Sequence, residues 1–264
     1  MSLRINNNIE AFNAHRQLTG TSDRVQKSME RLSSGSRINR AADDAAGLAI
    51  SEKLRGQIRG LSQAQRNAQD AVSLVQTAEG SLGEVHSMLQ RVRELAVQYK
   101  AGTLSDSDKA AITAEATQLV DEMKRIGSAS EFNGIKLLDA ATTITFQVGA
   151  NDADSKIDVT TGTLADMVSS LDVASSTISD IDKAISDVST LRGKFGAVQN
   201  RLEHTLGNLA TYQENLMASE SRIRDVDMAA EMVQFSKNQI LQQAGTSMLA
   251  QANQAPQGVL SLLR

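Results

Sequence analysis

The sequence predicts a mainly α-helical protein: a long antiparallel coiled-coil-like bundle with a small β-hairpin region, whose terminal helices pair as a second coiled coil. Three observations lead to this fold class. They are an unbroken heptad repeat in the C-terminal half, apolar stripes of similar spacing earlier in the chain, and a composition with only 3% aromatic residues. Apolar residues at heptad spacing form a stripe along one side of a helix, which packs as a thin seam. The expected architecture is a rod.

The longest predicted helix runs from Ile178 to Val226 and contains no proline. At ~1.5 Å per residue it would reach roughly 70 Å. A buried helix of a compact domain is the alternative, but such helices seldom exceed about 25 residues without caps. The first seam row is Ile181, Val188, Phe195, Leu202, Leu209, Leu216 and Ile223, and the second is Ala184, Leu191, Val198, Thr205, Tyr212, Ser219 and Val226.

Composition and charge narrow the function. The net charge of −4 comes from basic and acidic residues that are mixed along the chain. We therefore expect no charged surface that would bind nucleic acid or a membrane. Cysteine is absent, which excludes disulfides and thiolate chemistry. The first residues contain no apolar run of the Sec-signal kind, and no apolar stretch is long enough to cross a bilayer. A chain of this kind that leaves the cell would need another export route.

The chain as far as Ile126 predicts three further helices. The N-terminal seam ends at Gly35, which can take positive φ as a C-cap. Asp43 or Asp44 is expected to cap the next helix, whose stripe continues to about Tyr99. Ser105 and Asp108 have the spacing of a capping box for a third helix. Stripes on this helix, its predecessor and the long C-terminal helix together predict a bundle.

The middle of the chain changes from helical to alternating periodicity. Ile144, Phe146 and Val148 alternate with polar residues, as do Ile157 and Val159. A turn cluster at residues 151–154 separates the two runs, so we expect a β-hairpin within an excursion of about residues 135–170. A third strand at residues 136–138 is left open. Short strands are marginal alone and should pack on the bundle.

The two ends of the chain predict a helical pair that is weak in isolation. The C-terminal stripe is rich in Gln and Asn, and its expected partner is the N-terminal seam. The domain prediction is therefore residues 1–40 with 227–264 as a terminal pair that orders on assembly, and 41–226 as a rod domain. The small apolar surface that such a pair buries cannot offset the entropy cost of ordering the backbone, which is about 1–2 kcal/mol per residue. The predicted polymerisation residues are Ile5, Ile9, Phe12, Leu18, Val25, Leu241, Met248, Leu260, Leu262 and Leu263.

No pattern in the sequence indicates catalysis. His15, His86 and His204 lie far apart, and none belongs to a recognisable metal-ligand pair. Asp225 and Asp227 could suggest a metal site, but their position between two seams favours a cap for the helix that starts near Met228. We therefore expect no enzyme activity, no cofactor and no metal.

Residues 31–51, RLSSGSRINRAADDAAGLAIS, resemble the N-terminal signature of bacterial flagellins. The resemblance continues through the ranges 58–61, 66–70, 76–80 and 90–95 and returns in 196–202, 220–227, 250–254 and 259–264. It covers residues 1 to about 140 and 175 to 264. Only about 35 residues separate Asp139 from the long C-terminal helix, too few for a further domain, so the chain resembles a short flagellin without large outer domains.

This resemblance implies a structural subunit that self-assembles into the flagellar filament for motility, as an extracellular helical homopolymer. It implies as partners a flagellar export chaperone, the flagellar type III export apparatus, the filament cap and hook-associated proteins, and the host innate immune receptor TLR5. Nucleic acid and membrane insertion are not expected. Two alternatives remain: a hook–filament junction protein, which resembles flagellin at both ends, and a helical signalling hairpin of the chemoreceptor kind.

One segment carries the predicted recognition patch. Leu89, Val92 and Ala96 occupy the stripe of their helix, so Leu95 is expected on the opposite, polar face. A lone exposed leucine is the plain alternative. The segment resembles the flagellin stretch that TLR5 recognises, and the rod needs a lateral surface for neighbouring copies. The predicted shared patch consists of Gln90, Arg91, Glu94, Leu95, Gln98 and Glu115.

Overall fold

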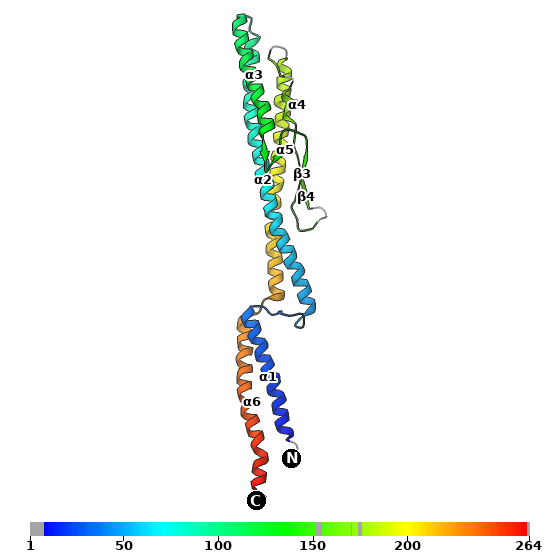
Figure 1. The fold of residues 1–264 in the computed structure, drawn as a ribbon, viewed down its shortest axis with the longest axis vertical. Helices are drawn as coiled ribbons and strands as arrows, with labels where there is room; N and C mark the ends of the chain where they lie inside the picture. Colours follow the sequence, from blue (N-terminus) through cyan, green and yellow to red (C-terminus); the bar gives the residue numbers. More distant parts are fainter. Residues whose placement is uncertain (1–7, 152–154, 170, 174–175, 263–264) are drawn as a thin grey trace. The chain divides into compact units, whose positions relative to one another are not determined.

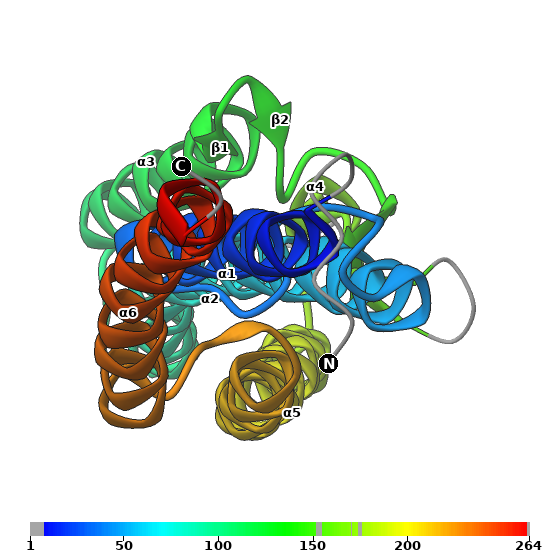
Figure 2. The same ribbon diagram turned by 90° about the horizontal axis from the view of Figure 1, so that it is seen from below.

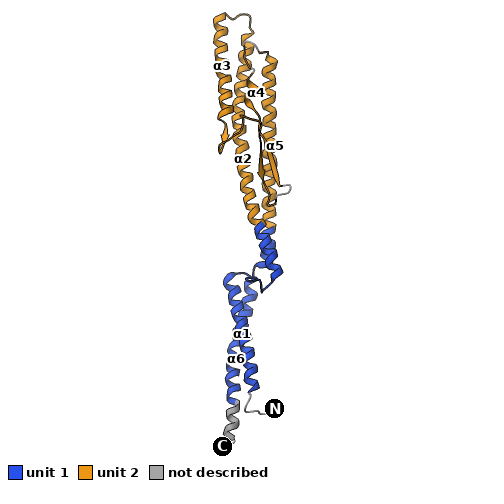
Figure 3. Cartoon of the chain, turned by 45° about the vertical axis from the view of Figure 1, so that its right-hand side comes forward, with its two compact units in different colours: residues 1–56, 216–264 blue, residues 57–215 orange. Residues whose placement is uncertain are grey.

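The computed structural model describes residues 8–151, 155–169, 171–173 and 176–262. The chain divides into two compact units, which are treated separately (Figure 3). We call Met1–Gly56 with Leu216–Arg264 the terminal unit, and Gln57–Asn215 the bundle unit.

Long helices dominate both units (Figure 1). The helices are α1 (Ile9–Ser34), α2 (Ala45–Tyr99), α3 (Asp106–Ala129), α4 (Leu164–Val168), α5 (Ile178–Arg224) and α6 (Met228–Leu262). The strands are β1 (Glu131–Phe132), β2 (Ile135–Lys136), β3 (Thr143–Gln147) and β4 (Lys156–Thr160). The mainly helical fold with a small hairpin region confirms the predicted fold class. No helix in the described ranges has an apolar stretch that could span a bilayer.

The bundle unit is built on the antiparallel packing of α2 against α5. Arg93 Nε lies 2.6 Å from Asp182 Oδ1, and Arg192 Nη2 lies 3.5 Å from Glu79 Oε1. Residue numbers therefore rise along one helix as they fall along the other. The first seam row predicted for α5 is buried in this unit as far as Leu209, and so are Ala184 and Leu191 of the second row. Farther along the second row, Val198 and Thr205 are half-buried and Tyr212 is 48% exposed, so the second row is confirmed only in part.

Helix α3 packs back along the last third of α2. Its capping box is present as predicted, because the Ser105 side chain accepts from the Asp108 backbone N–H and the Asp108 carboxylate accepts from that of Ser105. At its other end, the hydroxyl of buried Ser130 donates a 2.7 Å hydrogen bond to the Ile126 carbonyl, and its Oγ lies 3.0 Å from Ser81 Oγ on α2. Both ends of α3 are thus fixed by side-chain hydrogen bonds.

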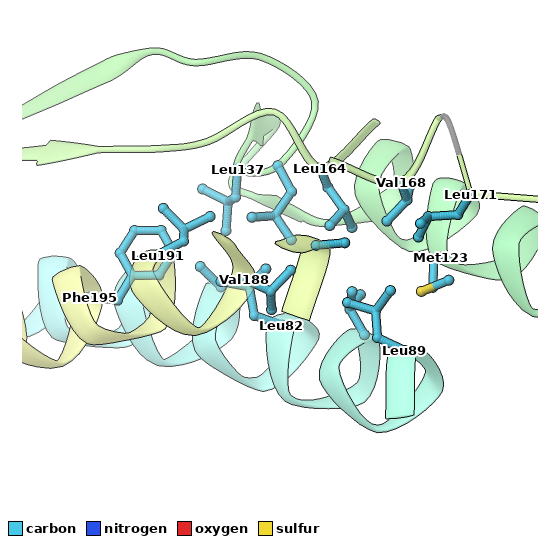
Figure 4. Packing of buried hydrophobic residues seen from close by; sticks show 14 of the residues in the cluster. Leu82, Leu89, Met123, Leu137, Leu164, Val168, Leu171, Val188, Leu191 and Phe195 are labelled. Carbon is cyan, nitrogen blue, oxygen red and sulfur yellow. The ribbon is translucent and has the colours of Figure 1, made fainter. Parts of the chain in front are cut away.

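The segment between α3 and α5 covers the core. Leu137 and Leu138 are fully buried, and the backbone N–H of Leu164 donates to the Leu138 carbonyl at 2.9 Å. Figure 4 shows side chains of this segment and of α4 directed at those of α2 and α5. Gly127 of α3 permits the close approach of α4, because a Cβ at this position would lie only 3.3 Å from Leu164 Cβ. The sequence analysis did not predict α4.

Two separate hairpins are present, and the larger one matches the prediction. β3 pairs antiparallel with β4, with Ile144 opposite Val159 and Phe146 opposite Ile157. The third strand considered at residues 136–138 does not join it. Instead β2 pairs with β1 across a turn in which Asn133 and Gly134 both have positive φ, as tight hairpins require. Most of the predicted turn at residues 151–154 lies outside the described residues.

The larger hairpin is fastened to α2 at its far end. Asn67 Nδ2 donates a 3.0 Å hydrogen bond to the Gln147 carbonyl at the end of β3. Gly60 of α2 permits a close approach of the segment that follows β3, since a Cβ at Gly60 would lie 3.0 Å from Ala150 Cβ. Near the start of β3, the buried Thr161 hydroxyl accepts from the Thr142 backbone N–H at 2.9 Å. The strands therefore pack on the bundle, as their small size requires.

We predict that Leu202→Asp will abolish cooperative unfolding of the bundle unit or lower its stability by about 4 kcal/mol or more, because a carboxylate would replace a fully buried side chain. Leu202→Ala should cost about 2–5 kcal/mol. Chemical denaturation followed by circular dichroism measures both. Ala197→Asp, at an exposed position of the same helix, is the matched control. Equal stability of Leu202→Asp and this control would contradict the assigned seam.

Candidate assembly and recognition surfaces

The terminal unit contains an antiparallel pair formed by α1 and α6. Asn8 caps α1 and donates from Nδ2 to the Ala252 carbonyl of α6 at 2.7 Å, while Arg31 Nη1 lies 3.5 Å from Glu231 Oε2 at the opposite end. Between them, a Cβ on Gly245 would lie 3.3 Å from Leu18 Cδ1. Figure 2 shows the two helices side by side. This pairing confirms the predicted partnership of the chain ends.

The α1–α6 pair buries little apolar surface in the monomer. Phe12 is 73% exposed and Ile240 is 69% exposed. Of the predicted polymerisation residues, Leu18 and Val25 are half-buried, and Ile9, Phe12, Leu241 and Met248 are exposed. Ile5 and Leu263 lie outside the described residues, and for Leu260 and Leu262 only the helical backbone of α6 is described. A pair this exposed gains little stability from its own seam.

The surface of the α1–α6 pair contains two hollows. The larger, of about 1100 Å³, lies between the helices and is lined by Leu18, Gly20, Leu241 and Met248 among others. The smaller, of about 480 Å³, lies on α6 alone and is lined by Met232, Val233, Ser236, Lys237, Ile240 and Leu241. The smaller hollow is almost entirely apolar. Apolar surface of this kind marks contact sites rather than solvated faces.

The connector from α1 to α2 is held by a carboxylate. Gly35 ends α1 with φ of 69°, and Asp44 Oδ1 accepts from the Gly47 backbone N–H at 2.8 Å, so both predicted caps are confirmed. Asp43 accepts a 2.6 Å contact from Lys27 Nζ and hydrogen bonds from the backbone N–H groups of Asn39 and Arg40. Chiefly through Lys27, these donors lower the pKa of Asp43 to about 2.

The two connectors of the terminal unit are joined to each other. The backbone N–H of Arg37 donates to the Arg224 carbonyl at 2.6 Å, and that of Val226 donates to the Gly35 carbonyl at 3.1 Å. Immediately beyond, Asp227 Oδ1 accepts from two backbone N–H groups of the first turn of α6, which confirms its predicted role as a cap. The two hydrogen bonds between the connectors hold the end of α1 next to the start of α6.

The predicted recognition patch lies in the bundle unit, on α2 and α3. Arg91 contacts Glu115 of α3 at 2.9 Å and Glu94 of its own helix at 3.1 Å. These carboxylates, Glu115 first, raise the pKa of Arg91. Gln90 and Gln98 are also exposed on α2. The polar part of the patch is therefore brought together.

Leu95 corrects the prediction for this patch. It is only 1% exposed and belongs to the core, so the expectation of an apolar residue on the polar face is wrong. The reason is that α2 packs against α3 as well as α5, and needs apolar residues over a wider arc than one seam supplies. Val97, on the same turn, is 51% exposed instead. One-stripe periodicity could not distinguish these two residues.

The three histidines are not brought together. His15, His86 and His204 lie on α1, α2 and α5, as predicted. Within the described ranges no three His, Cys, Asp or Glu residues gather in a way that could hold a metal ion. The described residues therefore form a coiled-coil-like helical protein without a candidate metal cluster.

Comparisons with known proteins identify the family. The model of the bacterial flagellin N-terminal helical region matches residues 5–143, and that of the bacterial flagellin C-terminal helical region matches residues 178–263. The chain belongs to the bacterial flagellin family. Flagellins are structural proteins, not enzymes, and these matches support a structural subunit of the flagellar filament.

Individual relatives match almost end to end. Flagellin of Halalkalibacterium halodurans is 54% identical, over 98% of this chain and 99% of the relative, and flagellin of Bacillus subtilis is 49% identical, over 99% and 100%. The flagellar filament 33 kDa core protein of Treponema phagedenis is 48% identical, over 98% and 99%. The crystal structure of Bacillus cereus flagellin is similar with a TM-score of 0.51 and 31% identity, over 55% of this chain and 88% of that one.

The connector generates a prediction about Asp43. Lys27→Met should raise the Asp43 pKa from about 2 toward its ordinary value of 3.8, since Lys27 is the largest cause of the shift. Because the folded pKa is lowered, the stabilisation that Asp43 contributes is present above pH ~4 and is lost as the pH falls through ~2. Side-chain NMR titration measures the pKa. Lys53→Met, at an exposed position of α2, is the control, and an unmoved Asp43 pKa in Lys27→Met would contradict the contact.

Proposed function

We propose that this chain polymerises into the flagellar filament through its terminal unit, after export by the flagellar type III system. The observation that carries the proposal is the exposed apolar surface of the α1–α6 pair, which includes Ile9, Phe12, Val233, Ile240 and Met248. In a monomer these side chains are exposed to water. Contact with other copies would bury them, and this burial would stabilise the assembly by about 25 cal/mol per Å² of apolar surface. Self-assembly therefore supplies the stability that the pair lacks.

The same weakness supports the proposed domain division. Residues 1–40 and 227–264 order against neighbouring copies, while residues 41–226 fold by themselves. A heterologous contact between different surfaces of one unit gives an open helical array when its rotation does not close. The two hollows, one between the helices and one on α6, are different surfaces of this kind. The filament is extracellular, and the export chaperone, the cap and the hook-associated proteins are partners on the way.

A hook–filament junction protein is the alternative that also pairs its ends. The relatives that match over 98% or more of this chain are named as flagellins or filament core proteins, which favours the filament subunit. The signalling hairpin is disfavoured by the matches of both flagellin regions.

Seeded extension tests the filament proposal. Purified monomer should lengthen short filament seeds in electron micrographs, and Phe12→Ser should slow extension about tenfold or more, because a large apolar side chain no longer enters the contact. Ile135→Ser, at an exposed apolar position of β2 in the bundle unit, is the matched control. Failure of the wild-type chain to extend seeds would overturn the proposal. Unchanged extension by Phe12→Ser would remove α1 from the contact.

The polar patch is proposed to serve neighbouring copies and the receptor TLR5. Arg91, Glu94 and Glu115 present a fixed arrangement of one guanidinium and two carboxylates at the surface. Their ion pairs are half-exposed and contribute little to stability. A constellation that is ordered yet unnecessary for folding is available for recognition. Leu95 supports it from the core and does not contact the partner.

The receptor test follows from this division of roles. Arg91→Ala combined with Glu115→Ala should leave bundle unfolding nearly unchanged while weakening both seeded extension and TLR5 signalling in a reporter cell assay. Arg125→Ala combined with Glu122→Ala removes another exposed ion pair of α3 and is the control. Leu95→Ala is unsuitable, because it should cost about 2–5 kcal/mol of stability. Full signalling and normal extension by the double variant would exclude the shared patch.

A further inference from the structure

The methionines of this chain are divided unequally between the two units. In the described residues, Met29, Met217, Met228, Met232 and Met248 belong to the terminal unit, and all of them are between 48% and 65% exposed. The bundle unit holds Met88, Met123 and Met167, of which Met123 is fully buried and the others are half-buried. Four of these exposed thioethers therefore lie on the α1–α6 pair, and that of Met217 lies on α5.

Two of these methionines line the hollows; the hollow on α6 exposes almost entirely apolar surface, whereas the one between α1 and α6 is also lined by charged residues such as Glu10, Arg16 and Arg24. Met232 lines the hollow on α6 together with Val233 and Ile240, and Met248 lines the one between α1 and α6. The methionine side chain is flexible and fills irregular gaps, which suits a contact that must adapt to a neighbouring copy. The same exposure makes the sulfur atoms reachable by small oxidants in the monomer.

We propose that oxidation of these five exposed methionines switches assembly off. The inference rests on the proposed self-assembly and concerns its regulation. The oxidant class is a two-electron oxygen-atom donor such as hydrogen peroxide. One oxygen atom passes to the thioether sulfur, so an S–O bond forms as the O–O bond breaks; sulfur is oxidised to the sulfoxide and peroxide is reduced to water.

The sulfoxide changes what the surface can bury. A sulfoxide oxygen is a polar acceptor, and the surface that the hollow around Met232 exposes is almost entirely apolar, with Ser236 and Lys237 as its two polar lining residues. Burying such an acceptor without a donor opposes the contact. In the monomer the same oxygen is solvated, so oxidation leaves the folded bundle unit intact. The change is reversible, because methionine sulfoxide reductases restore the thioether with a dithiol as reductant, which becomes a disulfide while the sulfoxide oxygen leaves as water.

Peroxide treatment of the full-length monomer tests the switch. Peptide mass mapping should show sulfoxide at the five terminal-unit methionines before Met123. Seeded extension by the treated monomer should fall about tenfold or more and recover after reductase treatment. A variant with leucine at all five positions should extend seeds and keep doing so after peroxide. Met88→Leu combined with Met167→Leu, in the bundle unit, should not protect.

A second measurement covers the case in which the fivefold variant assembles poorly. Met248→Gln imitates the polar product, and Met248→Leu keeps the site apolar. Without peroxide, Gln should slow extension and Leu should not. Oxidised monomer that extends seeds at the untreated rate, or equal extension by the Gln and Leu variants, would overturn the inference. Untreated wild-type monomer that fails to extend seeds would instead overturn the proposed function.

Discussion

The seam between α2 and α5 is the interaction on which the bundle unit depends. Leu82, Leu89 and Val92 of α2 and Val188 and Phe195 of α5 are all between 0% and 1% exposed. With only 3% aromatic residues, the chain gains its burial from many medium-sized aliphatic side chains along a line. Helix α3, the two hairpins and α4 then cover what this seam leaves open. The two hairpins and α4 are too short to persist without that support.

The two units differ in how much apolar surface their helices bury. In the bundle unit, α2 is buried on two sides by α3 and α5. In the terminal unit, α1 and α6 pack along their length against each other, and side chains such as Phe12 and Val233 remain in water. The connectors compensate locally: Asp43, Asp44 and Asp227 satisfy backbone N–H groups that a short seam alone would leave to solvent.

The features that could be predicted best from the sequence are those that depend on neighbouring residues. Gly35, Asp44, Ser105 and Asp227 were each predicted as caps, because a cap depends on residues only a few positions away. The heptad of α5 was also readable, since one long stripe records one long partner. Leu95 was misplaced because its burial is decided by α3, a second partner that one stripe does not record. Helix α4 and the β1–β2 hairpin are too short for periodicity to reveal.

The ion pairs between α2 and α5 also bear on how the bundle folds. Arg93 meets Asp182, and Glu79 meets Arg192, across 89 and 113 residues of intervening chain. Contacts of such sequence separation form late, after the loop entropy has been lost. The β1–β2 turn and α3, whose contacts are local, can form much earlier. Folding of the bundle is therefore limited by the arrival of α5, and a chain that ended before Ile178 would leave the apolar stripe of α2 uncovered.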